Sequence, residues 1–321
     1  SLNVTMSESR ELQHGRQLYL QNEERRRLRA ASDAATVTAE SKEINASTRI
    51  WTQITFSMDY DQPLIAHTLQ HYTRAGLDPQ CFLISLHQTS PDTDTAATAA
   101  ITDQLERDYG IRHIQAWYGN FTSQQSWEHK IAQRQAVGVS SQDWIVKVDA
   151  DELVRLGDIP SLLQGMAERD YDVVYGAMID RVSLDGGLSS ISNQTSLAEQ
   201  FPLECHVTKA GHANTTKAIA FRGYLTEYRA GHGMLHNQTL AGVYPQRLVI
   251  DHYKWSDSVL AKLLRRKQHY QWLEQQGRGH HWWRESDHFL HHLYTHERRI
   301  DVGNEEFLCR RAALSPVLAH S

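Results

Sequence analysis

From Arg49 onward, short apolar runs alternate with segments in which apolar residues recur at helical spacing. The runs are rich in β-branched and aromatic residues, which predicts buried strands, and the segments between them predict amphipathic helices. This alternation is typical of an α/β fold with a mostly parallel, Rossmann-like sheet flanked by helices. We predict strands at 50–56, 81–86, 111–117 and 144–148, and helices at 63–75, 96–109 and 124–137.

Beyond Pro160 the alternation becomes less regular. The pattern predicts a helix at 161–168 and a strand at 171–179, and the glycines near 186 predict a turn. Residues 188–242 show no clear period, so we expect irregular structure there. A further strand is predicted at 247–250, followed by amphipathic helices at 256–276 and 286–299.

The length of 321 residues fits one large domain with appended segments. Residues 1–47 are expected to form a polar helical extension and an Ala/Ser/Thr-rich linker. The extension is either a helix packed loosely on the main domain or an arm that binds a partner or a membrane surface. We place the main domain at 48–255, with halves at 48–155 and 156–255, and C-terminal helices at 256–321.

Composition narrows the functional classes. Lys and Arg number 33 against 38 Asp and Glu, and this net charge of −5 offers no positive field for nucleic acid or anionic membranes. Histidine is frequent, with 13 of 19 at or after His206. No glutamate-containing zinc motif accompanies the late histidines, so we interpret them as packed or surface residues, with ligand contact and metal binding as the alternatives. Those at helical spacing are His288, His291, His292 and His296.

The cysteines and asparagines point to different compartments. Cys81, Cys205 and Cys309 lie far apart and form no C-x-x-C pair, so we expect no disulfide framework and no cysteine zinc site. That expectation favours a reducing compartment and a cytoplasmic or membrane-peripheral protein, and we expect neither a transmembrane segment nor a signal peptide. Six of the eight asparagines lie in N-x-S/T sequons, which leaves a lumenal origin with a removed anchor open. The six are Asn3, Asn45, Asn120, Asn193, Asn214 and Asn237.

The segment Val148-Asp149-Ala150-Asp151-Glu152 carries the strongest chemical signal. A buried strand ends at Asp149, and in extended geometry the side chains of Asp149 and Asp151 face the same way. Two carboxylates with room for water and phosphate oxygens are typical of a Mg²⁺ or Mn²⁺ site. Ligands in α/β folds bind at the carboxyl ends of the strands, so we expect a metal site here rather than a solvated acidic loop.

A later strand delivers an imidazole at its end. His252 follows the strand predicted at 247–250, and we expect it to be a third metal ligand, although a lone histidine in such a place is more often structural. Lys254 and Lys262 are close enough in sequence to contact a phosphate. With Asp149 and Asp151, these residues predict a clamp for a metal ion and a diphosphate.

Several motifs together extend this prediction. They are WIVKVDADEL, Asp180-Arg181 with Asp185-Gly186, Gln200-Phe201-Pro202-Leu203, Gly231-His232 and HYKWS. In these motifs the chain resembles family-2-type glycosyltransferases of the GT-A fold, over about 49–267. The resemblance implies transfer of a sugar from a UDP- or GDP-sugar to a hydroxyl of a glycan, a lipid-linked acceptor or a small molecule. Inversion of the anomeric centre is our expectation, and retention, which needs no general base, is the alternative. It assigns the nucleotide-sugar to the half at 48–155 and the acceptor to the half at 156–255.

The resemblance also implies roles for single residues. Asp149, Asp151 and His252 would hold the cation. The diphosphate would contact Lys130, Arg134 and Lys254, although a solvated helix face is the alternative for Lys130 and Arg134. The nucleoside would lie at the ends of the first two strands, at Thr55, Phe56, Ser57 and His87.

An inverting transferase needs a general base for the acceptor hydroxyl. Asp180 is the first candidate, because it follows a strand and Arg181 favours its ionised form. A structural Asp–Arg pair is the equal alternative. Weaker candidates for the base are Glu204, Glu227 and Asp251, and candidates for acceptor contacts are His232, Trp282 and Trp283.

Two other functions stay open. The acidic segment also suits a metal-dependent nucleotidyltransferase or phosphotransferase, but no P-loop or G-x-G-rich phosphate loop occurs. The chain could also be a sugar-binding protein that keeps the fold without catalysis. Turnover of a nucleotide-sugar donor discriminates among these functions.

Overall fold

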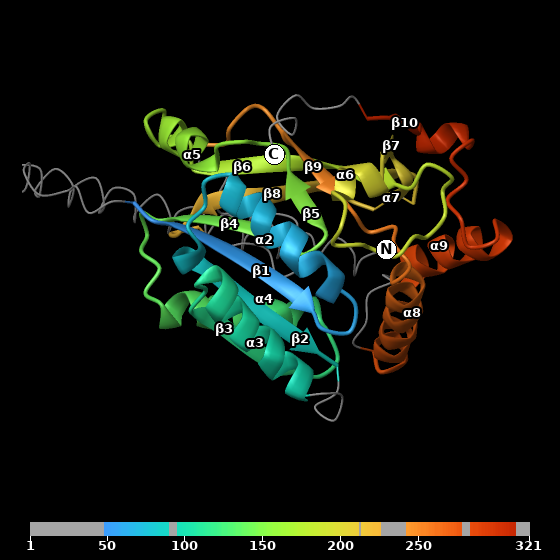
Figure 1. The fold of residues 1–321 in the computed structure, drawn as a ribbon, viewed down its shortest axis with the longest axis horizontal. Coiled ribbons are helices and arrows are strands. Elements are labelled where there is room, and N and C mark those ends of the chain that lie inside the picture. Colours follow the sequence, from blue (N-terminus) through green and yellow to red (C-terminus); the bar gives the residue numbers. More distant parts are fainter. Residues whose placement is uncertain (1–47, 90–94, 212, 226–241, 278–282, 313–321) are drawn as a thin grey trace, which may run out of the picture.

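The computed structural model of the chain describes residues 48–89, 95–211, 213–225, 242–277 and 283–312. A ten-stranded sheet runs through these residues, and helices flank it (Figure 1). The predicted α/β class, with a central sheet between helices, is confirmed. The N-terminal extension predicted at 1–47 lies outside the described residues.

The first half of the sheet is parallel. β1 (Ile50–Ser57) pairs with β2 (Phe82–Gln88) on one side and with β4 (Trp144–Asp149) on the other, and β2 pairs with β3 (His113–Tyr118). Every residue of β2 and all but the last residue of β4 are buried, as expected for central strands covered on both faces. All four strands lie where the apolar runs predicted them.

Helices connect these strands and supply the core. The helix α2 (Ile65–Arg74) buries Leu69 and Tyr72, and the chain leaves it through Gly76, whose φ of +86° suits glycine. The other connecting elements of this half are η1 (Gln62–Leu64), η2 (Pro79–Cys81), α3 (Thr95–Tyr109), α4 (Ser123–Ala136) and α5 (Ile159–Ala167). The predicted helices are therefore confirmed within a few residues at their ends. Within the described residues, no helix combines the length and the apolar character needed to cross a membrane.

The second half of the sheet is mostly antiparallel. β8 (Thr216–Arg222) lies between β4 and β6 (Val173–Val182) and is antiparallel to both. β6 also pairs with β7 (Leu203–Cys205) in antiparallel and with β9 (Leu248–His252) in parallel orientation. The sheet as a whole is therefore mixed, and β8 joins its two halves.

The expectation of irregular structure at 188–242 is wrong for part of that range. It contains α6 (Leu197–Gln200), β7, α7 (Val207–Ala210) and the central strand β8. The strand β8 contains two alanines and a buried lysine, Lys217, which interrupt the apolar and β-branched run by which strands are predicted. A second unpredicted strand, β5 (Glu152–Val154), directly follows the acidic segment and pairs with β9.

The C-terminal helices pack together at one end of the sheet. α8 (Val259–Gln275) and α9 (Trp283–Thr295) lie next to each other on the side toward which β1 points (Figure 1). Trp255, Phe289 and Leu293 form the centre of a separate apolar cluster there. Beyond α9 the chain forms η4 (Glu305–Phe307) and a short strand, β10 (Arg310–Arg311), which the sequence did not predict and which pairs with β7.

The pairing of β10 with β7 overturns the expectation about the cysteines. Cys205 and Cys309 form a disulfide, and Cys81 is free. The two bonded cysteines are 104 residues apart in sequence, and only the return of the chain to β7 brings them together. Sequence separation alone therefore gave the wrong prediction for this pair.

The strands β6 and β9 approach each other closely at Gly176, so a substitution there tests the packing of the sheet. A Cβ at Gly176 would lie 2.5 Å from Cδ1 of Ile250. We expect Gly176→Ala to lower the free energy of unfolding by about 1–3 kcal/mol, because the core is overpacked. The measurement is urea denaturation. The matched control is Gly165→Ala in α5, where a Cβ meets nothing within 4 Å and where alanine should be neutral or stabilising by up to ~1 kcal/mol. Equal losses in the two variants would contradict the packing.

Candidate active site

A cavity of about 740 Å³ lies at the carboxyl ends of the parallel strands. β1 and β2 contribute Thr55, Ser57 and His87 to its wall, and the acidic segment after β4 contributes Asp149 to Glu152. The helices α4 and α8 close other sides, with Lys130 on α4 and Lys262 on α8. The edge of the sheet that the sequence predicted as the ligand-binding edge is therefore hollowed and rich in charge.

Lys217 is the buried centre of this site, and sequence reasoning missed it. Its side chain is 1% exposed, and its Nζ donates to Oδ2 of Asp149 at 2.7 Å and to Oε2 of Glu152 at 2.6 Å. The backbone N–H of Asp149 also donates to Oε2 of Glu152 at 2.9 Å. A lysine in the middle of a buried strand needs carboxylate partners, which is the signal that could have revealed it.

These contacts fix the charges of the acidic segment. Burial alone would raise the pKa of Asp149, but the charges of Lys217 and Lys130 hold it well below its usual range. Burial also acts on Lys217, and there the two carboxylates outweigh it and hold the ammonium pKa well above its usual range. For Glu152 burial prevails and raises the pKa, despite Lys217. Asp149 and Lys217 are therefore an ionised pair.

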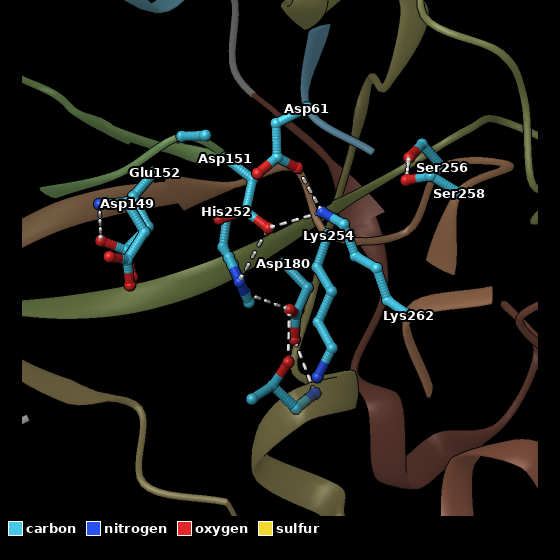
Figure 2. Close-up of polar contacts among 12 residues, drawn as sticks. Asp61, Asp149, Asp151, Glu152, Asp180, His252, Lys254, Ser256, Ser258 and Lys262 are labelled. Atoms are coloured by element: carbon cyan, nitrogen blue, oxygen red, sulfur yellow. Dashed lines mark hydrogen bonds and ion pairs between the residues drawn. The ribbon is translucent and has the colours of Figure 1, made fainter. Parts of the chain in front are cut away.

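His252 lies between two aspartates. Its Nδ1 donates to Oδ1 of Asp180 at 3.0 Å, and its Nε2 is 3.9 Å from Oδ2 of Asp151 (Figure 2). Burial lowers the pKa of His252, but the hydrogen bond to Asp180 and the charge of Asp151 outweigh it, so the pKa is raised. A carboxylate that orients an imidazole in this way is the usual support of a metal-binding histidine.

The acidic side chains after β1 meet basic side chains of α8 across the cavity. Oδ1 of Asp61 accepts from Nζ of Lys262 at 2.6 Å, and Asp59 is paired with Arg265 at 2.7 Å. Lys262 is also 3.9 Å from Asp151 (Figure 2). Burial lowers the pKa of Lys262, but the charges of Asp61 and Asp151 raise it to about 12. Asp59, Asp61 and Arg265 were not predicted as site residues.

The predicted three-ligand metal cluster does not form. Over the described ranges, no group of three or more His, Cys, Asp or Glu side chains is placed to hold a metal ion. The chain turns at Ala150 and Asp151 instead of staying extended, so Asp149 faces Lys217 while Asp151 faces His252 and Lys262. Asp151 and His252 are then the two side chains that could hold a cation, if phosphate oxygens and water supplied its other ligands.

The geometry does not support three of the four predicted general bases, Asp180, Glu204 and Asp251. Asp180 is 2% exposed, and its carboxylate accepts from Thr208 N and Oγ1, at 2.6 Å each, as well as from His252. Glu204 and Asp251 both pair with Arg155, at 2.7 and 2.9 Å, and neither lines the cavity. Each of these carboxylates already accepts hydrogen bonds from neighbouring side chains or from the backbone. They therefore position neighbouring groups and do not face the cavity.

Other predicted site residues fall into three groups. Thr55, Ser57, His87, Lys130, Lys254 and Lys262 line the cavity. Phe56 is buried in the core, Arg134 donates to Gln53 Oε1 at 2.8 Å, and Trp283 donates its indole N–H to Glu274, so these three are not cavity residues. Glu227, His232 and Trp282 lie outside the described residues.

Comparisons with known proteins give structural neighbours only. No family model and no curated protein matches the chain. A crystal structure of S. aureus TarS is 8% identical, with a TM-score of 0.33, and the match covers 69% of this chain and 39% of that one. The structure of S. aureus TarS 1-349 in complex with UDP is 12% identical over 42% of this chain and 36% of its own, with a TM-score of 0.27. Likeness at this level assigns neither a family nor an activity.

The buried charge of Lys217 leads to a first prediction for the stability of the chain. Lys217→Met leaves Asp149 and Glu152 without their shared cation, so we expect a loss of about 3–5 kcal/mol in the free energy of unfolding. The measurement is chemical denaturation. As control, Lys267→Met removes the more exposed pair with Asp287 and should cost no more than about 1 kcal/mol. A loss for Lys217→Met as small as the control's would contradict the buried pair of Lys217 with Glu152.

The Asp180–His252 pair makes a second prediction. Asp180 stabilises protonated His252 in the folded chain, so this stabilisation is full below the ordinary histidine pKa of about 6.5 and is lost as the pH rises through the raised folded-state pKa. Asp180→Asn should therefore lower the His252 pKa in an NMR titration of the ring. Asp251→Asn is the control on the same strand as His252, because Asp251 faces Arg155 and Arg181. An unchanged His252 pKa in Asp180→Asn would refute the pairing.

Proposed function

We propose that the chain is a glycosyltransferase that moves a sugar from a nucleoside-diphosphate sugar to a hydroxyl acceptor. The cavity volume of about 740 Å³ falls within the range of about 300–1,000 Å³ that is common for ligand sites. Its position at the carboxyl edge of the parallel strands is the place where α/β folds bind nucleotides. The reaction would replace the bond from the anomeric carbon to the diphosphate by a bond to the acceptor oxygen, and the acceptor proton would leave.

The observation that carries this proposal is the mixture of charges around the cavity. Lys130, Lys254 and Lys262 present ammonium groups to it, which suits the two phosphates of a nucleoside diphosphate. Their carboxylate neighbours prevent a purely basic pocket: Lys262 is paired with Asp61, and Lys254 lies 3.6 Å from Glu285. A bound diphosphate can therefore contact these ammonium groups, and when it is absent each of the two lysines still has a carboxylate partner.

The other wall of the cavity suits a nucleoside. The ring of His87 packs against Trp117 and Phe121, with ring centroids 4.1 and 5.3 Å apart. Phe121 lines the cavity and is 46% exposed, so it offers an aromatic face to a base. Thr55 and Ser57, at the end of β1, also line this wall, beside His87.

A divalent cation, Mn²⁺ or Mg²⁺, is part of the proposal. Asp151 and His252 would hold it, and Asp180 would orient His252 through the bond to Nδ1. Such an ion supplies Lewis-acid neutralisation of the diphosphate leaving group when it is bound. The chain's own Lys262 lies 3.9 Å from Asp151 and would share the negative charge of the same group.

The test is donor turnover. The full chain is incubated with UDP-, GDP- and CMP-sugars, with Mn²⁺ or with EDTA, and release of the nucleotide (UDP, GDP or CMP) is measured. We expect release from one donor class and at least about tenfold loss in EDTA. A loss at least as large is expected in Asp151→Asn, since even the mutation of a side chain that only supports a metal ligand typically costs about 10–100-fold. The control Asp108→Asn changes an exposed carboxylate of α3 and should keep full activity.

Each outcome decides between functions. Full activity of Asp151→Asn, or turnover that EDTA leaves unchanged, would contradict the cation site but not the transferase. Transfer of phosphate or nucleotide instead of sugar would favour the nucleotidyl- or phosphotransferase. Donor or glycan binding without any turnover would favour the non-catalytic sugar-binding protein. The anomeric configuration of the product, determined by NMR, distinguishes the expected inversion from retention.

A further inference from the structure

The asparagines of this chain are concentrated in sequons to a degree that composition does not explain. Ser and Thr together make up 45 of the 321 residues, so eight asparagines should yield about one N-x-S/T sequon by chance. Six of the eight are in sequons. An excess of this size indicates that the N-x-S/T sequons have a function in this chain.

The structure places three of these sequons where modification requires them. Asn120 lies between β3 and α4, Asn193 lies in the turn before α6, and Asn214 lies just before β8. All three are exposed and outside helices and strands, as an acceptor for an N-linked glycan must be. Asn214 accepts from the backbone N–H of Thr216 through Oδ1, which leaves its amide nitrogen available.

A second, independent observation concerns redox chemistry. Cys205 and Cys309 form a disulfide between β7 and the start of β10. Stable structural disulfides form in oxidising compartments, and cytosolic thiols are kept reduced. Compartments with that chemistry are also those in which N-x-S/T sequons are glycosylated.

We propose that this chain matures in an oxidising, glycosylating compartment and carries an N-linked glycan at Asn193, with Asn120 and Asn214 as further acceptor sites. At each site the amide nitrogen loses a proton and forms a bond to the anomeric carbon of an oligosaccharide, and the lipid diphosphate that carried the oligosaccharide leaves. The thiols of Cys205 and Cys309 lose two protons and pass two electrons to the disulfide of a thiol–disulfide oxidoreductase, as their own disulfide forms.

The three sites differ in what a glycan would do. Asn120 and Asn214 line the cavity, so a glycan on either would stand beside it and restrict the acceptors that can enter. Asn193 does not line the cavity, and its side chain forms no hydrogen bond to the rest of the described structure. A glycan at Asn193 would therefore leave the cavity open, and this makes Asn193 the principal site.

The first experiment uses the full chain purified from its own cells, with free thiols alkylated at lysis. Peptides are mapped by mass spectrometry without reduction, after enzymatic glycan removal in heavy-oxygen water. We expect Asn193 converted to labelled aspartate and a disulfide-linked peptide pair that contains Cys205 and Cys309. Unlabelled asparagine at positions 120, 193 and 214 would overturn the glycan sites, and alkylated Cys205 and Cys309 would overturn the oxidising compartment.

The second experiment assigns the site with variants of the full chain expressed in the same cells. Thr195→Ala destroys the sequon of Asn193, and Thr195→Ser keeps it, while the hydrogen bond at Thr195 uses only its backbone carbonyl. We expect the electrophoretic shift of one glycan to disappear in Thr195→Ala and to persist in Thr195→Ser. A shift that persists in both variants would overturn the assignment to Asn193. Donor turnover is measured separately, so the failure of this inference leaves the proposed function standing.

Discussion

The buried ammonium of Lys217 is the constraint on which the site depends. It lies on β8, the strand that joins the parallel and antiparallel halves of the sheet, and its two partners lie at the end of β4 and the start of β5. A charge in that position requires both carboxylates nearby, so the turn between β4 and β5 has little freedom. The same contacts keep Asp149 ionised and direct it away from Asp151.

The remaining charges of the site connect segments that are distant in the chain. β5 pairs with β9, so Glu152 lies opposite His252, and the acidic turn lies beside the imidazole. Asp61 and Lys262 then tie the loop after β1 to α8 across 201 residues of sequence. In each case a carboxylate that is costly to bury has a cation or an imidazole as its partner. The cavity therefore contains many charged groups, but their opposite charges largely balance.

Local sequence patterns predicted those elements whose formation depends on residues within the same segment. The buried strands β1 to β4 and the helices between them follow from apolar periodicity and lie as expected, whereas the acidic segment turns at Ala150 and Asp151, where an extended backbone was predicted. β8, Lys217 and the disulfide did not follow, because each depends on a partner far away in the chain. The orientation of Asp149 was wrong for the same reason: extended geometry is a local rule, and the distant Lys217 overrides it.

The Cys205–Cys309 bond also has a topological consequence. It closes a covalent ring that includes β8, β9, α8 and α9. The ring therefore carries His252 and Lys262, which line the cavity, and the buried Lys217 that pairs with Asp149. In the chain-entropy model, a ring of roughly 100 residues stabilises the folded state by about 4.7 kcal/mol through the unfolded ensemble. Cleavage of one peptide bond within the ring opens it but releases no fragment, so a nicked molecule keeps both walls of its cavity on one covalent framework.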